Sequence, residues 1–199
     1  MACIGNIDEV VHDAAMRQLL SRHPDSCGIA AARVEVSIMR PRIDSLVLSY
    51  VVAGNISDIR LPSLAAANRS DGLWQHTCFE AFIRASPGAG YYEFNFSPST
   101  CWAAYTFSGY RSGMDMAAGV SAPAIDGRAS PDSYTLQATL ELDGLSALSR
   151  KSPWHLGLSA VIEDISGGKS YWALAHPPGK PDFHHEDCFA YEFAPTMPS

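Results

Sequence analysis

The sequence predicts an all-β protein, an antiparallel β-sandwich of jelly-roll or immunoglobulin-like type with about nine or more strands and one short N-terminal helix. Two observations predict this class. From about Gly28 onward, short runs of β-branched and aromatic residues alternate with Gly, Pro, Asn and Asp, a texture typical of many short strands. No second long helical pattern follows, which favours antiparallel strands over a parallel sheet with crossover helices.

The N-terminal helix is predicted from about Ile7 to His23, with Asn6 as its cap and Pro24 after its end. Apolar residues recur there every four positions, at Ile7, Val11, Ala15 and Leu19. The chain therefore divides into an N-terminal helical segment, residues 1–24, and a β-domain, residues 25–199.

Strands are predicted in the following order: Arg33 to Met39, Ser45 to Ala53, Leu73 to Arg84, Tyr91 to Ser97, Trp102 to Phe107, Ser133 to Leu142, Trp154 to Glu163, Ser170 to His176, and Cys188 to Phe193. Most of these runs alternate between apolar and polar residues, so one face is dry and the other meets solvent. Gly167 and Gly168 predict a hairpin. The Gly-, Ala-, Ser- and Pro-rich stretch from Gly109 to Ser133 predicts a long surface excursion.

Composition narrows the class of function. With 199 residues, 47% of them hydrophobic and 18% charged, the chain can bury a sizeable core. Its formal charge of −7 gives no basic surface for a phosphate backbone, so nucleic acid is not an expected partner. Exposed strand edges could pair in a homo-oligomer.

The expected location is the cytoplasm. The first residues lack the basic start and apolar run of a secretory signal, and no apolar segment is long enough to span a bilayer, so no membrane association is expected. The five cysteines are scattered without a Cys-x-x-Cys pair, which indicates reduced thiols.

Polar side chains interrupt two neighbouring predicted strands. Period two places Trp74, His76, Cys78, Glu80 and Phe82 on one face of the first strand. A face that mixes an indole, an imidazole and a carboxylate indicates a lined cavity, although each of these groups could also be ordinary core or a satisfied buried polar group.

The next strand adds a carboxylate and an amide, Glu93 and Asn95. An aromatic ring beneath sugar C–H faces, with Glu80, Asn95 and Arg111 around the hydroxyls, would suit a carbohydrate. The proline-rich segment from Ala175 to Cys188 is stiff and is expected to rim the pocket. Lys180, Arg111 and His184 would favour an anionic group on the ligand. The full set predicted to bind ligand is Trp74, His76, Glu80, Glu93, Asn95, Arg111, Trp172, His176, Lys180 and His184.

Three alternatives stay open beside non-catalytic binding without a cofactor. A divalent metal could use the histidines His76, His176, His184 and His185 with the oxygen donors Asp182, Glu186 and Asp187, although no His-Glu-x-x-His frame occurs. A haem, non-covalent because Cys-x-x-Cys-His is absent, could use Met114, Met116 and His176. A hydrolase or isomerase could use Glu80 or Glu93 with a loop histidine as acid and base.

Several blocks of sequence together resemble the bacterial DOMON-like proteins, which are related to family 9 carbohydrate-binding modules and to haem- and sugar-binding DOMON domains. The blocks are Asp71–Phe82, Glu93–Pro98, Trp102–Tyr105, Tyr110–Met114, Gly157–Glu163 and Ser170–His185. The pattern of the wider superfamily is matched by Trp74, Glu80, Phe82, Phe94 and Asn95. The resemblance covers nearly everything from His23 onward, and it implies a β-sandwich that binds a sugar or a sugar derivative, with haem as the alternative. His76, Cys78 and the His/Pro/Lys loop depart from the pattern.

Overall fold

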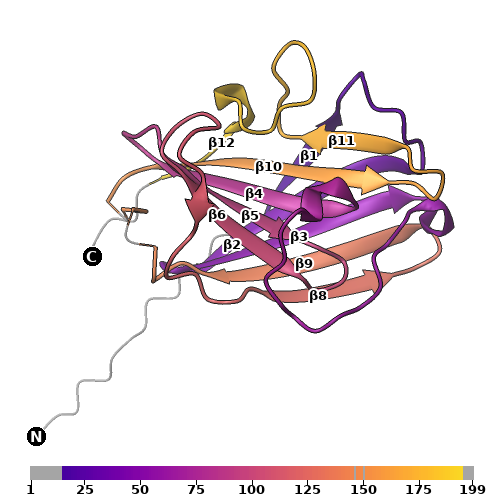
Figure 1. The fold of residues 1–199 in the computed structure, drawn as a ribbon, viewed down its shortest axis with the longest axis horizontal. Helices are drawn as coiled ribbons and strands as arrows, with labels where there is room; N and C mark the ends of the chain where they lie inside the picture. The colour runs from indigo at the N-terminus through magenta and orange to yellow at the C-terminus, as the bar shows by residue number, and fades with distance from the viewer. Residues whose placement is uncertain (1–14, 146, 150, 195–199) are drawn as a thin grey trace, which may run out of the picture.

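The computed structural model describes residues 15–145, 147–149 and 151–194 (Figure 1). The strands in this part of the chain are β1 (Met16–Arg22), β2 (Ala31–Arg42), β3 (Ser45–Gly54), β4 (Cys78–Ala85), β5 (Tyr91–Phe96), β6 (Trp102–Phe107), β7 (Asp115–Met116), β8 (Ala124–Ala129), β9 (Ser133–Glu141), β10 (Trp154–Glu163), β11 (Lys169–Ala173) and β12 (Tyr191–Phe193). Three single-turn 3-10 helices complete the described elements: η1 (Ile56–Asp58), η2 (Leu73–Gln75) and η3 (Glu186–Cys188).

The strands form one continuous antiparallel sheet in the order β7-β6-β5-β4-β10-β11-β1-β2-β3-β9-β8, with β12 paired to β10. The sheet curls, so that β3 and β9 pack against β4 and β5 across a shared hydrophobic core (Figure 1). Tyr50 on β3 spans this core: its ring lies 5.1 Å from that of Phe79, and its hydroxyl donates to the Glu80 carbonyl oxygen at 2.7 Å. The predicted all-β antiparallel class is confirmed, whereas a division into two separate sheets is not.

Alternation along β4 decides which side chains reach this core. Phe79, Ala81 and Ile83 point into it, and truncating a fully buried ring such as that of Phe79 costs about 3–5 kcal/mol. The intervening residue Phe82 belongs to a second, smaller apolar cluster on the opposite face of the sheet. The sheet is therefore covered on both faces around β4, and Glu80, which alternates with Phe82, points toward the second face.

The predicted N-terminal helix is wrong where the structure describes it. Residues from Met16 to Arg22 form strand β1, which pairs with β2 and β11, while residues 7–14 lie outside the described residues. Leu20 is the one fully buried side chain of β1, so the strand has no apolar alternation that the sequence could display. The last two positions of the period-four pattern, Ala15 and Leu19, are exposed, Leu19 at 59%, so they form no buried apolar face.

The remaining differences concern strand ends and one excursion. The predicted strands starting at Leu73 and Cys188 begin as the single turns η2 and η3, and the strands follow them. The stretch from Gly109 to Ser133 contains two short strands, β7 and the edge strand β8. The hairpin at Gly167 is confirmed: β10 and β11 pair on either side of it, and Gly167 has a φ of 88° that glycine adopts without strain. Within the described residues, no helix has the length and apolar character needed to cross a membrane.

Candidate functional site

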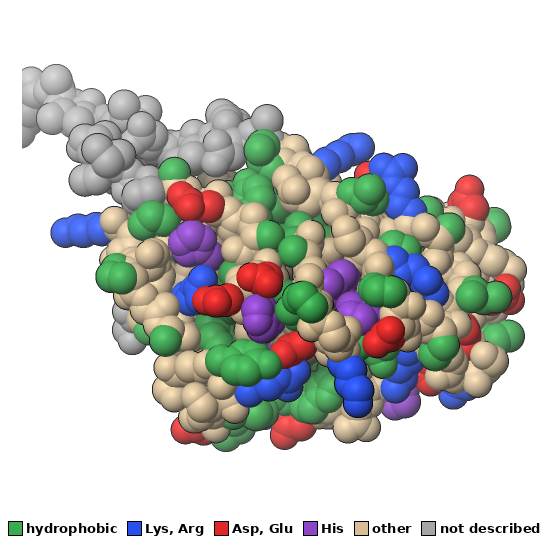
Figure 2. All heavy atoms as spheres, turned by 90° about the horizontal axis from the view of Figure 1, so that it is seen from above, with side chains coloured by type: hydrophobic (Ala, Val, Ile, Leu, Met, Phe, Trp, Pro, Cys, Tyr) green, Lys and Arg blue, Asp and Glu red, His purple; other side chains and the backbone are tan. Residues whose placement is uncertain are grey.

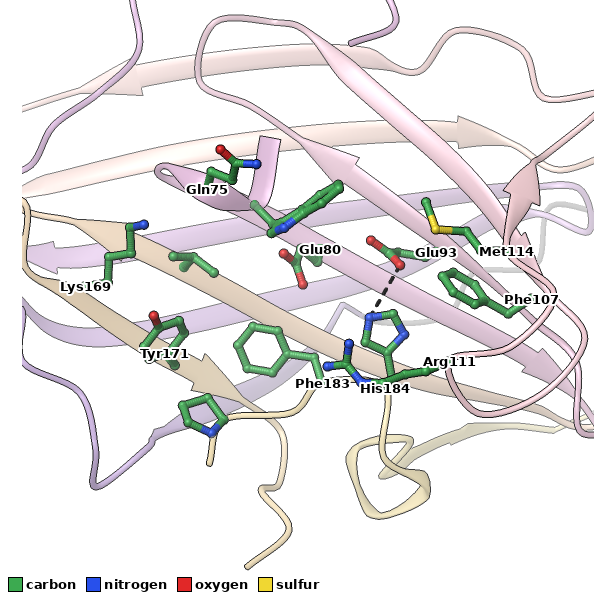
Figure 3. Close-up of a pocket in the computed structure, with 13 residues that line it drawn as sticks. Gln75, Glu80, Glu93, Phe107, Arg111, Met114, Lys169, Tyr171, Phe183 and His184 are labelled. Carbon is green, nitrogen blue, oxygen red and sulfur yellow. Dashed lines mark ion pairs between the residues drawn. The ribbon is translucent and has the colours of Figure 1, made fainter. Parts of the chain in front are cut away.

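A pocket of about 500 Å³ lies on the second face of the sheet, opposite the main core (Figure 3). The segment between β11 and β12 borders the pocket through Pro181, Phe183 and His184. Figure 2, which views the molecule from the side where Figure 1 draws this segment, shows histidine, acidic and basic side chains near the middle of that face. The pocket is lined by Trp74, Gln75, Glu80, Glu93, Phe107, Arg111, Met114, Val161, Lys169, Tyr171, Pro181, Phe183 and His184.

Two carboxyl groups form the floor of the pocket. Register sets their positions: Glu80 on β4 lies opposite Asn95 on β5, and Glu93 on β5 lies opposite Phe82, so the two acids are diagonal neighbours on one face. Both are buried, at 3% and 6% exposure. Ser159 on β10 donates its hydroxyl to Oε2 of Glu80 at 3.1 Å, and the side-chain amide of Asn95 donates to Oε1 of Glu93 at 2.7 Å.

Burial and mutual repulsion control the charge of this floor. Burial, and then the nearby charge of Glu93, raise the pKa of Glu80 to about 8, against the smaller opposing effects of Ser159 and Arg111. Burial also raises the pKa of Glu93, whereas the bonds from Asn95 and the charge of Arg111 lower it. At neutral pH Glu80 is therefore mostly protonated and can donate a hydrogen bond, while Glu93 accepts one.

His184 closes one side of the floor as a neutral imidazole. Burial, and then the charge of Arg111, lower its pKa to about 4. The hydroxyl oxygen of Tyr91 accepts from the backbone N–H of Arg111 at 3.3 Å and lies 2.8 Å from Nδ1 of His184. In the tautomer in which Tyr91 donates its proton to this ring, Nδ1 is the unprotonated nitrogen. Nε2 of His184 then carries the ring proton and faces Oε2 of Glu93 at 3.8 Å, the contact dashed in Figure 3.

Arg111 reaches the pocket from the turn after β6 in an uncommon backbone conformation, with a φ of 48°. Its Nε and one terminal nitrogen donate to the same oxygen of Asp182, at 3.2 and 2.8 Å. The hydroxyl of Tyr110 bonds the other oxygen of Asp182. The positive charge of Arg111 is thus paired mainly with Asp182.

Trp74 forms part of the wall of the pocket. Gly72, with a φ of 76°, starts the turn η2 in the left-handed region, and Trp74 is the middle residue of this turn. The indole packs edge-on against Tyr105, with ring centroids 6.2 Å apart, and remains 40% exposed. Phe183 and Tyr171 add further aromatic surface, so the polar floor lies beneath apolar walls.

Five of the ten residues predicted to bind ligand meet in this pocket: Trp74, Glu80, Glu93, Arg111 and His184. These five residues are up to 110 positions apart in the sequence, yet they line one cavity. They therefore remain candidates for a common ligand site.

The other five predicted residues do not line this pocket. Asn95 lies behind Glu93, and Trp172 is buried in the main core with its Nε1 bonded to Ser170. His76 contacts Glu163 at 2.7 Å, and Nε2 of His176 contacts the Ser21 carbonyl oxygen at 2.8 Å. Lys180 lines a separate hollow beside Tyr110 and Asp182.

Eight lining residues were not in the predicted ligand-binding set: Gln75, Phe107, Met114, Val161, Lys169, Tyr171, Pro181 and Phe183. Of these, Met114 was predicted only as a possible haem ligand, and Pro181 and Phe183 lie in the proline-rich segment that was expected to rim the pocket. Most are apolar, and an apolar residue on an alternating strand looks like core. The usable signal was alternation itself, because Val161 stands two positions from Ser159, which bonds the floor of the pocket.

The residues predicted as possible metal or haem ligands do not all lie in the pocket. Among the described residues, no group of three or more His, Cys, Asp or Glu side chains is placed to hold a metal ion. Nδ1 of His185 accepts a hydrogen bond from the backbone of Asp187 at 3.3 Å. Of the predicted haem ligands, Met114 lines the pocket, Met116 is 63% exposed on β7, and Nδ1 of His176 is buried.

No protein-family model matches the chain, and no curated protein matches it. Solved structures do. A protein from Bacteroides uniformis, provisionally described as carbohydrate-binding, is 13% identical with a TM-score of 0.62, over 87% of this chain and 84% of that one. A family 9 carbohydrate-binding module from Caldicellulosiruptor kristjanssonii, solved with cellotriose and with glucose, is 12% identical with a TM-score of 0.48 in both structures. The match covers 83% of this chain and 75% or 76% of the module. The chain therefore shares the fold of the Bacteroides uniformis protein.

Proposed function

We propose that this protein binds a small polar ligand, a carbohydrate or sugar derivative, in the pocket between Trp74 and His184. One observation carries the proposal: two buried carboxyl groups form the floor of an open cavity beneath a half-exposed indole. The volume of about 500 Å³ falls in the range of small-molecule sites, roughly 300–1,000 Å³.

The chemistry of the floor supports a sugar. Each hydroxyl of a sugar both donates and accepts hydrogen bonds, and the floor offers both kinds of partner: a protonated Glu80 and Nε2–H of His184 donate, and Glu93 accepts. The face of Trp74 can pack against the C–H groups of a pyranose ring. The likeness in fold to the Bacteroides uniformis protein is consistent with this function, as is the DOMON-like resemblance of the sequence, which would make the curled sheet a variant of that β-sandwich.

Titration calorimetry with a panel of mono- and disaccharides tests the proposal. We expect at least one sugar to bind the wild-type protein, and Trp74→Ala and Glu80→Gln to weaken it at least about tenfold, the equivalent of 1.4 kcal/mol. Leu64→Ala, at an 81% exposed apolar residue outside the pocket, and Glu192→Gln, at an exposed acid, are matched controls. A panel without any binding, or binding that the pocket variants leave unchanged, would count against the proposal.

A hydrolase is a second candidate, favoured by the same pair of acids. The backbones of diagonal neighbours across two strands lie about 7–8 Å apart, and both side chains point to the same face. Glycoside hydrolysis uses two carboxyl groups about 5–9.5 Å apart, one of which must carry a proton. Burial raises the pKa of Glu80 to about 8, so this acid can hold that proton at neutral pH. Chromogenic glycosides test it: turnover lost in both Glu80→Gln and Glu93→Gln is expected of an enzyme, and absence of turnover with sugars that bind would reject this candidate.

A further inference from the structure

The two acids on the pocket floor have no cation of their own among the described residues. The guanidinium of Arg111 is held by Asp182 through two hydrogen bonds. The one ion-pair contact of Glu93 within the described residues is the 3.8 Å approach of His184. Glu80 is bonded by the neutral hydroxyl of Ser159.

The remaining cation of the pocket lies at its other end. Lys169 is opposite Glu163 in the β10–β11 pair, and Glu80 is opposite Ser159. Four residues of strand therefore separate their levels, about 13 Å at 3.3 Å per residue. Figure 3 shows Lys169 at the opposite end of the pocket from Glu93 and His184.

The walls around the acids suit a positive group. Trp74, Phe107 and Phe183 line the same cavity, and the faces of aromatic rings attract cations. Lys180, one of the three groups expected to favour an anion, lies outside this pocket. Arg111, the second of them, is already paired with Asp182.

We infer that the carboxyl end of the pocket takes the protonated amine of an amino sugar, with Glu80 and Glu93 as its acceptors. This inference rests on the proposed function and narrows its ligand class. The amine would supply the missing counter-charge, and the sugar hydroxyls would meet His184 and the open side of the pocket.

If an ammonium ion binds beside Glu80, the protonation state of this acid should change in a way that can be measured. The groups that face Glu80 are Glu93 from β5, Cys78 from β4, Ser159 from β10, Arg111 from the turn after β6 and, from the side of the main core, Tyr50 from β3. Glu93 in turn faces His184, Asn95 and the charge of Arg111. It also lies near the titratable groups Cys78 of β4, Tyr91 of β5 and Tyr105 of β6. Because Glu80 is mostly protonated at neutral pH, an incoming ammonium ion ionises it: the amine keeps its protons, and the proton of the Glu80 carboxyl leaves for solvent.

The test compares glucosamine with glucose and N-acetylglucosamine by calorimetry at about pH 6.5, where the amine is charged, in two amine-free buffers of different ionisation enthalpy. We expect glucosamine to bind at least about tenfold more tightly than either neutral sugar, in line with a charge-assisted hydrogen bond. Its binding should also release a proton, seen as a buffer-dependent enthalpy. Glu80→Gln should abolish that release and reduce the preference, whereas the exposed control Glu192→Gln should change neither.

The outcomes separate the two proposals. Glucose or N-acetylglucosamine binding as tightly as glucosamine overturns the amino-sugar inference and leaves sugar binding in place. Failure of every sugar in the broader panel to bind overturns both. The comparison among sugars uses the wild-type protein, so it stands even if Glu80→Gln does not fold.

Discussion

Replacing Glu80 by glutamine should stabilise the protein, and by an amount that grows with pH. Glu80 has an ordinary pKa of 4.5 when the chain is unfolded and about 8 when it is folded. Between these values the folded state binds more protons than the unfolded state, so the free energy of unfolding falls as pH rises from about 4.5 to about 8.

The size of the effect follows from the two pKa values. One pKa unit corresponds to about 1.4 kcal/mol, so the buried carboxyl costs about 3 kcal/mol at pH 7 and about 5 kcal/mol above pH 8. Glutamine has nearly the same shape, cannot ionise, and can still accept the hydrogen bond from Ser159. We therefore expect Glu80→Gln to be close to neutral at about pH 4.5 and to stabilise the protein by a few kcal/mol at about pH 8.5.

Urea denaturation at several pH values measures this difference directly. Glu192→Gln, an exposed glutamate at 60% side-chain exposure, serves as the control for removing one surface charge. A stability difference between Glu80→Gln and wild type that is constant between pH 5 and pH 8.5 would refute the reasoning, since it would mean that Glu80 ionises without cost in the folded protein.

Three further predictions follow from individual contacts. Trp74→Ala should weaken ligand binding at least about tenfold in calorimetry while the melting temperature hardly changes, because the indole is 40% exposed; a large fall in melting temperature would show a structural role instead. His184 should give imidazole NMR signals that stay constant from about pH 8 to about pH 5, because burial holds its pKa at about 4; titration near the ordinary value of 6.5 would contradict the neutral imidazole. Tyr50→Phe should lower the free energy of unfolding by about 1–2 kcal/mol, since it removes the buried bond to the Glu80 carbonyl oxygen, and an unchanged denaturation midpoint would argue against that bond.

Strands with one dry face were predictable, and strands without one were not. In β9, Tyr134, Leu136 and Leu140 are buried between half-buried and exposed neighbours, so the alternation is visible in the sequence. In β8, no side chain is fully buried, since β8 is an edge strand, and its Ala-Ile-Asp-Gly-Arg-Ala sequence looks like a loop. Edge strands bury little apolar surface, so their sequences carry little periodic signal.

For the candidate site too, some residues could be predicted from the sequence and others could not. The acids of β4 and β5 were predictable because a carboxylate inside a strand pattern is conspicuous. Trp172 was predicted to bind ligand because an indole suits a sugar ring, but its side chain lies in the main core. Its neighbour Tyr171 lines the pocket instead, because adjacent residues of β11 point to opposite faces. Which face of β11 carries the pocket depends on how the segment between β11 and β12 folds back, and that is a long-range property.

The charges at the pocket floor are arranged in a way that favours the proposed binding of a cationic ligand. A scaffold could pair Glu93 with Arg111, but Asp182, which also accepts from the hydroxyl of Tyr110, holds that guanidinium, and His184 stays neutral. Two buried acids without a cation destabilise the free protein, because desolvation raises the free energy of their charged forms. A cationic ligand that reached Glu80 and Glu93 would offset part of this cost on binding, whereas a neutral ligand would not. The free energy that the buried acids cost the free protein would therefore favour cationic over neutral ligands.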